Sequence, residues 1–194
     1  MDKNLVTVIL AAGGSTRMNK PKQLLKWKEN TLIENSIITS ESINRGKNMI
    51  VLGSKFNKIF KTVSKYNIRI INNKKWKNGI GSSISIAIKN ILNDDHQIDG
   101  VLFVLADQPF VSKKYLEKMI KEFKKNKIVV TKYGEKNGIP AIFSKLFFNE
   151  LLELNEDFGA KKIINQNKES LIILKPDLKT LVDIDTPEDY NNFI

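Results

Sequence analysis

Two kinds of side chain in this sequence could act on phosphates: cations beside a turn of small residues, and aspartates that follow apolar runs. The turn, residues 11–14, reads Ala-Ala-Gly-Gly and follows the apolar run 5–10. Small residues let a ligand approach the backbone, whose free N–H groups can receive phosphate oxygens or the edge of a base. Arg17, Lys20 and Lys22 follow at once and would supply positive charge. This stretch fits a phosphate loop and fits equally an ordinary strand-to-helix turn followed by a basic surface loop.

The spacing of the glycines excludes two familiar phosphate loops. The sequence contains no GxxxxGK[ST] motif, and the turn does not have the GxGxxG spacing with an acidic residue about twenty positions later. This argues against a P-loop NTPase and against a dinucleotide-binding dehydrogenase.

Two aspartates, Asp107 and Asp185, each follow an apolar run, which for Asp107 is residues 101–105. In an open parallel sheet, ligands bind outside the carboxyl ends of the strands, so both side chains would face one crevice. Two such carboxylates could share Mg²⁺, which prefers a few carboxylates together with substrate phosphates. Taken singly, each aspartate is better explained as a cap: Asp107 in the loop before Pro109, and Asp185 at the helix start near Thr186.

Other catalytic chemistry has little support in the residues. His96 is the only histidine and lies in a polar loop, and cysteine is absent, which argues against a zinc site or a Cys/His pair. No serine sits in a GxSxG motif. Trp27 and Trp76 could stack on a base or a pterin ring, but partial burial in the core is the favoured reading for each.

Apolar runs without alternation are separated by segments with helical spacing, which predicts an α/β fold. Strands are expected at 5–10, 49–52, 68–71, 101–105, 128–131, 171–174 and 181–184. Helices are expected at 32–43, 56–63, 84–91, 113–126 and 145–154, with a shorter helix after 158 and caps at Thr31, Ser112 and Thr186. The pattern predicts a Rossmann-like, doubly wound, mostly parallel sheet in which one of the late strands, 171–174 or 181–184, is antiparallel at an edge.

Length and composition favour one domain, residues 1–194, in the cytoplasm. No run of eighteen apolar residues exists, so no membrane span is expected. The first residues lack the basic start and apolar core of a signal peptide, and the absence of cysteine fits a reducing compartment.

The net charge of +11 raises the question of nucleic acid. The excess is nearly all lysine, because arginine occurs only at positions 17, 45 and 69. The densest lysine cluster, 113–127, falls on the expected solvent face of an amphipathic helix. No aromatic residues alternate with arginine to form a stacking surface. The charge would attract anionic small molecules, and neither a nucleic-acid nor a membrane partner is expected.

Residues 10–25 resemble the signature of the MobA-like nucleotidyltransferases, most closely the molybdenum cofactor cytidylyltransferase branch and related accessory proteins of molybdenum hydroxylases. Further motifs follow in family order at 76–83 (WKNGIGSS), 105–109 (LADQP), 138–143 (GIPAIF), 157–160 (DFGA) and 183–187 (DIDTP). The resemblance therefore covers nearly the whole chain. It implies the glycosyltransferase-A type of fold and a reaction in which an NTP and a phosphorylated acceptor yield a nucleotidyl conjugate and pyrophosphate.

The resemblance also implies residue roles. Nucleotide-binding roles fall on Ala11, Ala12, Gly13, Gly14, Ser15, Arg17, Lys22, Gly81, Ser82, Ser83 and Asp107. Catalytic roles fall on Lys22, Arg17 and Asp107. The resemblance assigns Mg²⁺, as cofactor, to Asp107 and Asp185.

The Ala-Ala-Gly loop at 11–13 implies CTP as the nucleotide, since the guanylyl branch carries Ala-Gly-Gly or Gly-Gly variants. The implied acceptor is a molybdopterin-type cofactor, with a molybdenum hydroxylase as partner enzyme. The chain departs from the family pattern at Asn19, Ile139 and Lys161, and the last two are expected on the acceptor side. Alternatives are transfer to a sugar phosphate or methylerythritol phosphate, and a non-catalytic factor that binds molybdenum cofactor.

Overall fold

The computed structural model describes residues 3–18, 20–43, 47–94, 97–155, 157 and 159–194, with the side chains of all of these except Lys179 and Leu181. Asn19, His96 and Phe158, singled out in the sequence, lie outside the described residues.

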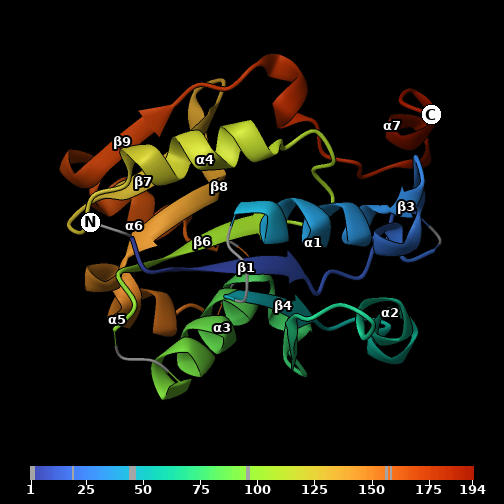
Figure 1. Ribbon diagram of the computed structural model, residues 1–194, viewed down its shortest axis with the longest axis horizontal. Coiled ribbons are helices and arrows are strands. Elements are labelled where there is room, and N and C mark those ends of the chain that lie inside the picture. Colours follow the sequence, from blue (N-terminus) through green and yellow to red (C-terminus); the bar gives the residue numbers. More distant parts are fainter. Residues whose placement is uncertain (1–2, 19, 44–46, 95–96, 156, 158) are drawn as a thin grey trace.

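A mostly parallel seven-stranded sheet forms the centre of the molecule (Figure 1). Its strands, in spatial order, are β5 (Arg69–Asn72), β4 (Asn48–Leu52), β1 (Leu5–Ala11), β6 (Gly100–Leu105), β8 (Lys136–Ser144), β7 (Ile128–Tyr133) and β9 (Leu171–Leu174). Every residue of β1 and β4 is buried, which explains why these strands read as continuous apolar runs. The expected α/β fold is confirmed.

The antiparallel strand is β8, which lies earlier in the chain than 171–174 and 181–184, the runs of which one was expected to be antiparallel at an edge. β8 lies between β6 and β7 and is antiparallel to both, whereas the edge strand β9 pairs with β7 in parallel. The cause is the short turn at Gly134, where φ is +55°, which folds β8 back along β7 as a hairpin. The buried half of β8, residues 141–144, then pairs with the central strand β6.

Residues 181–184, expected as a strand, form no ladder. The chain there leaves a 3₁₀ helix, Leu178–Leu181, and continues without regular structure. One backbone bond, from the Ile184 N–H to the Asp107 carbonyl at 2.9 Å, holds the segment to the end of β6. Since Ile184 is buried in a small cluster beside the sheet, its apolar character reflects that cluster and not strand pairing.

Helices cover both faces of the sheet. One face carries α1 (Leu32–Ile43), α2 (Phe56–Val63) and α4 (Lys113–Glu122), and the other carries α3 (Ile80–Asp94), α5 (Phe148–Leu152) and α6 (Lys161–Gln166). Figure 1 shows α1 and α4 on the side of the sheet opposite α3 and α5. A two-stranded hairpin, β2 (Lys26–Trp27) with β3 (Asn30–Thr31), packs beside the C-terminal α7 (Pro187–Asn191). Thr186 caps α7 in a reciprocal capping box with Asp189, as its sequence predicts.

Three helix boundaries differ from the expectation. α3 begins at Ile80, so residues 81–83 lie in its first turn, and α4 ends at Glu122 because Phe123 takes a non-helical conformation. Residues 145–154 form a 3₁₀ turn followed by the short α5.

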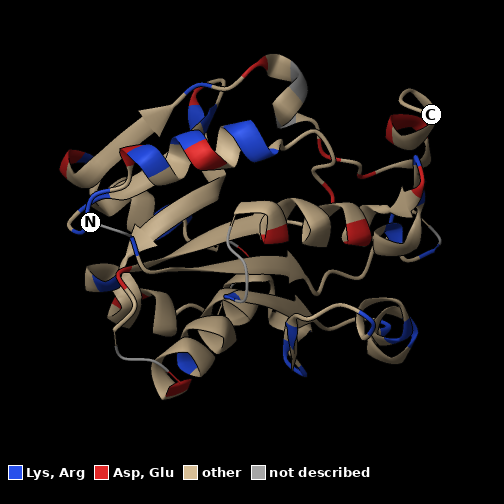
Figure 2. Ribbon diagram, viewed as in Figure 1, with Lys and Arg blue, Asp and Glu red and all other residues tan. Residues whose placement is uncertain are grey.

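Figure 2 shows bands of basic and acidic residues alternating along α4, whose lysines are exposed as expected. None of the helices in the described part of the chain combines the length and the apolar composition that a membrane crossing requires.

The start of α1 is stabilised by a buried carboxylate, Glu34. Glu34 Oε2 accepts hydrogen bonds from the Thr31 N–H and hydroxyl, both at 2.8 Å. Glu34 Oε1 accepts from the Tyr66 hydroxyl at 3.1 Å and pairs with Lys65 Nζ at 2.6 Å. Burial by itself would raise the pKa of Glu34, but these partners outweigh it and lower the pKa from 4.5 to about 2.

We expect Glu34→Gln to lower the free energy of unfolding at pH 7 by about 1–2 kcal/mol, a figure reduced because Lys65 is exposed to solvent. Because the folded pKa is depressed, this stabilisation is fully present above about pH 4.5 and is lost as the pH falls toward 2. Urea unfolding of both proteins at pH 7 and pH 3 measures the difference, which should shrink at the lower pH. An equal difference at both values would contradict the ionic role.

Candidate active site

A cavity of ≈ 500 Å³, the first cavity, opens where the carboxyl ends of β1 and β6 meet. This is the edge at which open parallel sheets bind ligands, and the volume is within the range of small-molecule sites. Its lining includes Ala11, Ala12, Gly13, Gly14, Thr16, Lys22, Gln23, Trp76, Gly79, Ser83, Asp107 and Asp157. The glycine loop, Ser83, Lys22 and Asp107 of the sequence analysis therefore converge on one space.

The glycine loop is organised by Gln23, which the sequence analysis did not single out. The buried Gln23 amide donates to the carbonyls of Ala11 and Gly13, both at 3.0 Å, and accepts from the Ser15 hydroxyl at 3.2 Å. The Ser15 hydroxyl also accepts the Lys22 N–H at 3.0 Å. The sequence feature that could have identified Gln23 is its place as a polar residue directly before the apolar pair 24–25. The Ser15 hydroxyl therefore makes hydrogen bonds within the loop, and Ser15 is not part of the lining of the first cavity.

Trp76 forms one wall of the first cavity by lying against two glycines. A Cβ on Gly53 would come within 2.5 Å of Trp76 Cβ, and one on Gly14 within 3.2 Å of the indole ring. Glycine is needed at Gly53 for this close approach. Trp76 is partly buried while facing the cavity, whereas Trp27 is 5% exposed and belongs to the core, as expected.

Of the three small residues at the start of α3, only Ser83 lines the first cavity. Gly81 and Ser82 are buried, and the Ser82 hydroxyl lies 2.8 Å from the Gly79 carbonyl. The buried amide of Asn73 donates to the hydroxyls of Ser82 and Ser83, at 2.9 and 3.0 Å. Asn73 was not found from the sequence, although it is a polar residue directly after a strand.

Lys22 brings the two aspartates together. Its ammonium is paired with Asp107 Oδ2 and, at 2.7 Å, with Asp185 Oδ1. Arg17 binds the other oxygen of Asp185 at 2.8 Å, although the Arg17 side chain is 65% exposed and does not line the cavity. Two residues 78 positions apart in the sequence (107 and 185) therefore contact one atom, on the same side of the sheet as the glycine loop.

The charges of this cluster shift its pKa values. Burial by itself lowers the pKa of Lys22, but the attraction and hydrogen bonds of Asp107 and Asp185 outweigh it and raise the pKa. Partial burial favours a higher pKa for Asp185, and its pairing with Lys22 and Arg17 lowers the pKa overall. Both shifts favour the charged forms, so Lys22 and Asp185 are ionised together at neutral pH.

The position of Asp185 depends on its neighbour Ile184 and not on a strand end. Ile184 is fully buried among Met18, Leu25, Trp27 and Leu32, and its N–H binds the Asp107 carbonyl. The packing of Ile184 thus holds the backbone beside Asp185 against the end of β6.

We expect Ile184→Ala to lower the free energy of unfolding by about 2–5 kcal/mol, because it leaves a cavity in a closed apolar cluster. Urea unfolding measures this effect. Leu178→Ala is the matched control, since Leu178 is 85% exposed and its truncation should change stability by less than about 0.5 kcal/mol. Equal effects of the two substitutions would contradict the packing role of Ile184.

A second cavity of ≈ 310 Å³ adjoins the first and shares Ile80, Leu105 and Asp157 with it. Its lining also includes Gln108, Tyr133, Lys136, Asn137, Ile139, Lys161 and Asp183. Ile139 and Lys161, the departures from the family pattern, both lie here.

Gln108 connects the second cavity to Asp107, its neighbour in the chain. The Gln108 amide donates to the Tyr133 hydroxyl at 2.9 Å and to Asp183 Oδ1 at 2.8 Å. Asp183 keeps some exposure to solvent. Its partial burial, and to a lesser extent repulsion from Asp107, raise its pKa to about 6. Burial also raises the pKa of Tyr133. The sequence analysis did not assign Gln108 or Asp183, although the Asp-x-Asp spacing was visible.

Asp107 and Asp185 fit a divalent metal ion. Asp107 Oδ1 is buried without a hydrogen-bond partner, and carboxylate oxygens are the donors that Mg²⁺ and Mn²⁺ accept. Among the described residues no group of three or more histidines and carboxylates gathers around one point. An ion held by this pair would therefore need further oxygens from a phosphate or from water.

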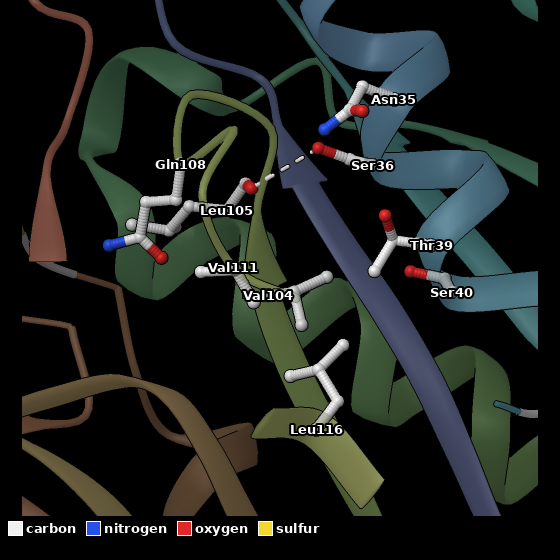
Figure 3. A pocket seen from close by; sticks show the side chains of 9 residues that line it. All are labelled: Asn35, Ser36, Thr39, Ser40, Val104, Leu105, Gln108, Val111 and Leu116. Atoms are coloured by element: carbon white, nitrogen blue, oxygen red, sulfur yellow. Dashed lines mark hydrogen bonds between the residues drawn. The ribbon is translucent and has the colours of Figure 1, made fainter. Parts of the chain in front are cut away.

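A third cavity lies away from this chemistry, between α1 and β6 (Figure 3). Its volume of ≈ 10 Å³ is room for about one water molecule. The Ser36 hydroxyl, 3.5 Å from the Leu105 carbonyl, points across it. This cavity is too small for a substrate.

Comparison with known proteins points to one family. The model of the MobA-like NTP transferase domain matches residues 7–171. The bifunctional protein GlmU of Buchnera aphidicola is 32% identical over 149 residues, which cover 75% of this chain. The chain spans only 31% of the length of that relative. The purine catabolism protein PucB of Bacillus subtilis is 26% identical and is matched over 96% of this chain and 94% of its own length.

Solved structures agree with this fold. Rv0371c of Mycobacterium tuberculosis superposes with a TM-score of 0.81 at 25% identity, over 96% of each chain. A complex of that protein with manganese superposes with a TM-score of 0.78 at 23% identity, over 98% of each chain.

Proposed function

We propose, because this chain belongs to the MobA-like NTP transferase family, that it transfers CMP from CTP to the terminal phosphate of a molybdopterin-type cofactor and releases pyrophosphate. Nucleotidyl transfer itself is the chemistry of the family. The choice of CTP and of the acceptor is the finer part of the proposal.

One observation carries the proposal: Lys22, Asp107 and Asp185 meet at the edge of the first cavity, beside the glycine loop. The first cavity would hold the nucleotide, with Ala11, Ala12, Gly13 and Ser83 at its base and ribose and with Gly14 beside its triphosphate. The second cavity would hold the acceptor, because it adjoins the first beside Asp107 and carries two lysines for a phosphorylated ligand.

The reaction requires little proton transfer. An oxygen of the acceptor phosphate attacks the α-phosphorus, a new P–O bond forms, and the bond between the α-phosphorus and the bridging oxygen breaks to release pyrophosphate. The nucleophile is already an anion, which fits a site without a histidine or cysteine among its lining residues. The protein must align two anions that repel each other and stabilise the charge of the transition state.

Lys22 and Arg17 are the cations for this purpose. The Lys22 side chain lines the first cavity and would contact the α-phosphate, while the exposed Arg17 could close over the pyrophosphate. Asp107 and Asp185, together with phosphate oxygens, would hold Mg²⁺. When bound, the ion would neutralise part of the phosphate charge.

The choice of CTP rests on the Ala11-Ala12-Gly13 loop, which resembles that of cytidylyl members of the family. The assignment of a molybdopterin-type acceptor rests on the branch of the family that the sequence resembles. It also rests on the two lysines of the second cavity and on the apolar wall that Ile80 and Ile139 form there. A planar ring with a phosphate tail would match such a mixed surface.

The test is pyrophosphate release by the purified protein with Mg²⁺, each of the four NTPs and molybdopterin, with sugar phosphates and methylerythritol phosphate as other acceptors. We expect release with CTP and molybdopterin together. Turnover with another acceptor would keep nucleotidyl transfer and reject the molybdopterin assignment. Tight cofactor binding without turnover under any condition would reject the enzyme in favour of an accessory factor.

A further inference from the structure

The ammonium of Lys22 occupies the place between the two carboxylates at which a divalent ion would bind. It is paired with Asp107 Oδ2 and Asp185 Oδ1, one oxygen from each carboxylate. The three side chains are only 15%, 18% and 33% exposed, so solvent screens these pairs weakly. A divalent ion shared by the two carboxylates would lie close to this ammonium, and the two cations repel each other, so they compete for the pair.

Hydrogen bonds anchor the backbone of Lys22, and the two carboxylates hold its side chain at the ammonium. The Lys22 N–H binds the Ser15 hydroxyl and its carbonyl accepts the Leu25 N–H, both at 3.0 Å. The side chain reaches from there on four flexible carbons, and it lines the first cavity as well as touching the carboxylates. A short movement would therefore transfer the ammonium from the carboxylates to a phosphate in that cavity.

We propose that Lys22 is a tethered counter-ion that closes the Asp107–Asp185 pair to free divalent ions until a nucleotide enters the first cavity. The triphosphate then attracts the ammonium, and the two carboxylates become available to the ion that arrives with the nucleotide. The free protein thus binds metal weakly and avoids holding two uncompensated carboxylates in a partly buried site. This inference rests on the proposed function, because it takes these aspartates as the metal ligands.

The experiment measures the binding of Mn²⁺ alone, without nucleotide, from the electron paramagnetic resonance signal of free Mn²⁺ at constant ionic strength. We expect Lys22→Met to bind Mn²⁺ at least about tenfold more tightly than the wild type, since two charge-assisted hydrogen bonds no longer compete. Lys20→Met is the matched control, because Lys20 is an exposed lysine of the same loop. It removes the same charge and should change the affinity by less than about twofold.

Two further variants locate the effect. Lys22→Gln should reproduce the tighter binding, with circular dichroism showing that both Lys22 variants are folded. The double variant Lys22→Met, Asp107→Asn should lose the gain, because one of the two ligands is then uncharged.

Unchanged affinity in the Lys22 variants, the same gain in Lys20→Met, or absence of Mn²⁺ binding in every variant would each overturn the inference. Wild-type turnover with CTP, Mg²⁺ and molybdopterin is measured separately. Turnover without a gain in Lys22→Met would reject the counter-ion role alone, and a gain without wild-type turnover would reject the proposed function alone.

Discussion

Asp107→Asn is expected to lower the rate of pyrophosphate release about 10²–10³-fold while leaving the fold intact. The substitution keeps the size of the side chain and removes a charge that would hold the metal ion and that pairs with Lys22 in the free protein. The loss of one preorganised charge at a phosphoryl-transfer site typically has this effect on the rate. The measurement is the initial rate with saturating CTP, Mg²⁺ and molybdopterin.

Asp177→Asn is the control for Asp107→Asn, because Asp177 is exposed and lines neither cavity. It should leave the rate within about twofold of the wild type. If Asp107→Asn retained the wild-type rate while folded, Asp107 would have no part in the mechanism.

Lys22→Ala is expected to lower the same rate about 10²–10³-fold, for a different reason. The ammonium would stabilise the negative charge that spreads over the phosphate oxygens as the acceptor attacks. Lys20, which the sequence grouped with these cations, is exposed and lines neither the first nor the second cavity, so Lys20→Ala should leave the rate within about twofold of the wild type.

The two variants differ in metal binding, which separates the roles of the residues. Asp107→Asn loses a metal ligand and should bind Mn²⁺ no more tightly than the wild type. Lys22→Ala should bind Mn²⁺ more tightly and still turn over slowly. Full activity in Lys22→Ala would show that the triphosphate is neutralised by other groups, Arg17 among them.

Much of the fold could be predicted from the sequence because its signals are local. The fully buried strands β1 and β4 read as unbroken apolar runs, since helices cover both faces of the sheet. The start of α1 at Thr31 and of α7 at Thr186 follows from hydrogen bonds within one turn. The strand ends also placed the glycine loop and Asp107 at one edge of the sheet, because parallel strands end there.

The position of β8 and the course of residues 181–184 depended on partners distant in the sequence. The hairpin turn places β8 against β7, and the other edge of β8 pairs with β6. The apolar residues around Ile184 serve a small cluster beyond the strand ends, which periodicity does not distinguish from a strand.

The residue types that gather at the site could be read from neighbours in the chain: small residues after β1, cations behind them, and aspartates after β6 and near the chain end. Their contacts with one another depend on the folded molecule, through the Gln23 amide beneath the loop and the packing of Ile184 beside Asp185. Residue types and turns depend on neighbours in the chain, whereas the contact of one ammonium with two carboxylates requires segments about 80 and 160 residues apart to be fixed by the same packed core.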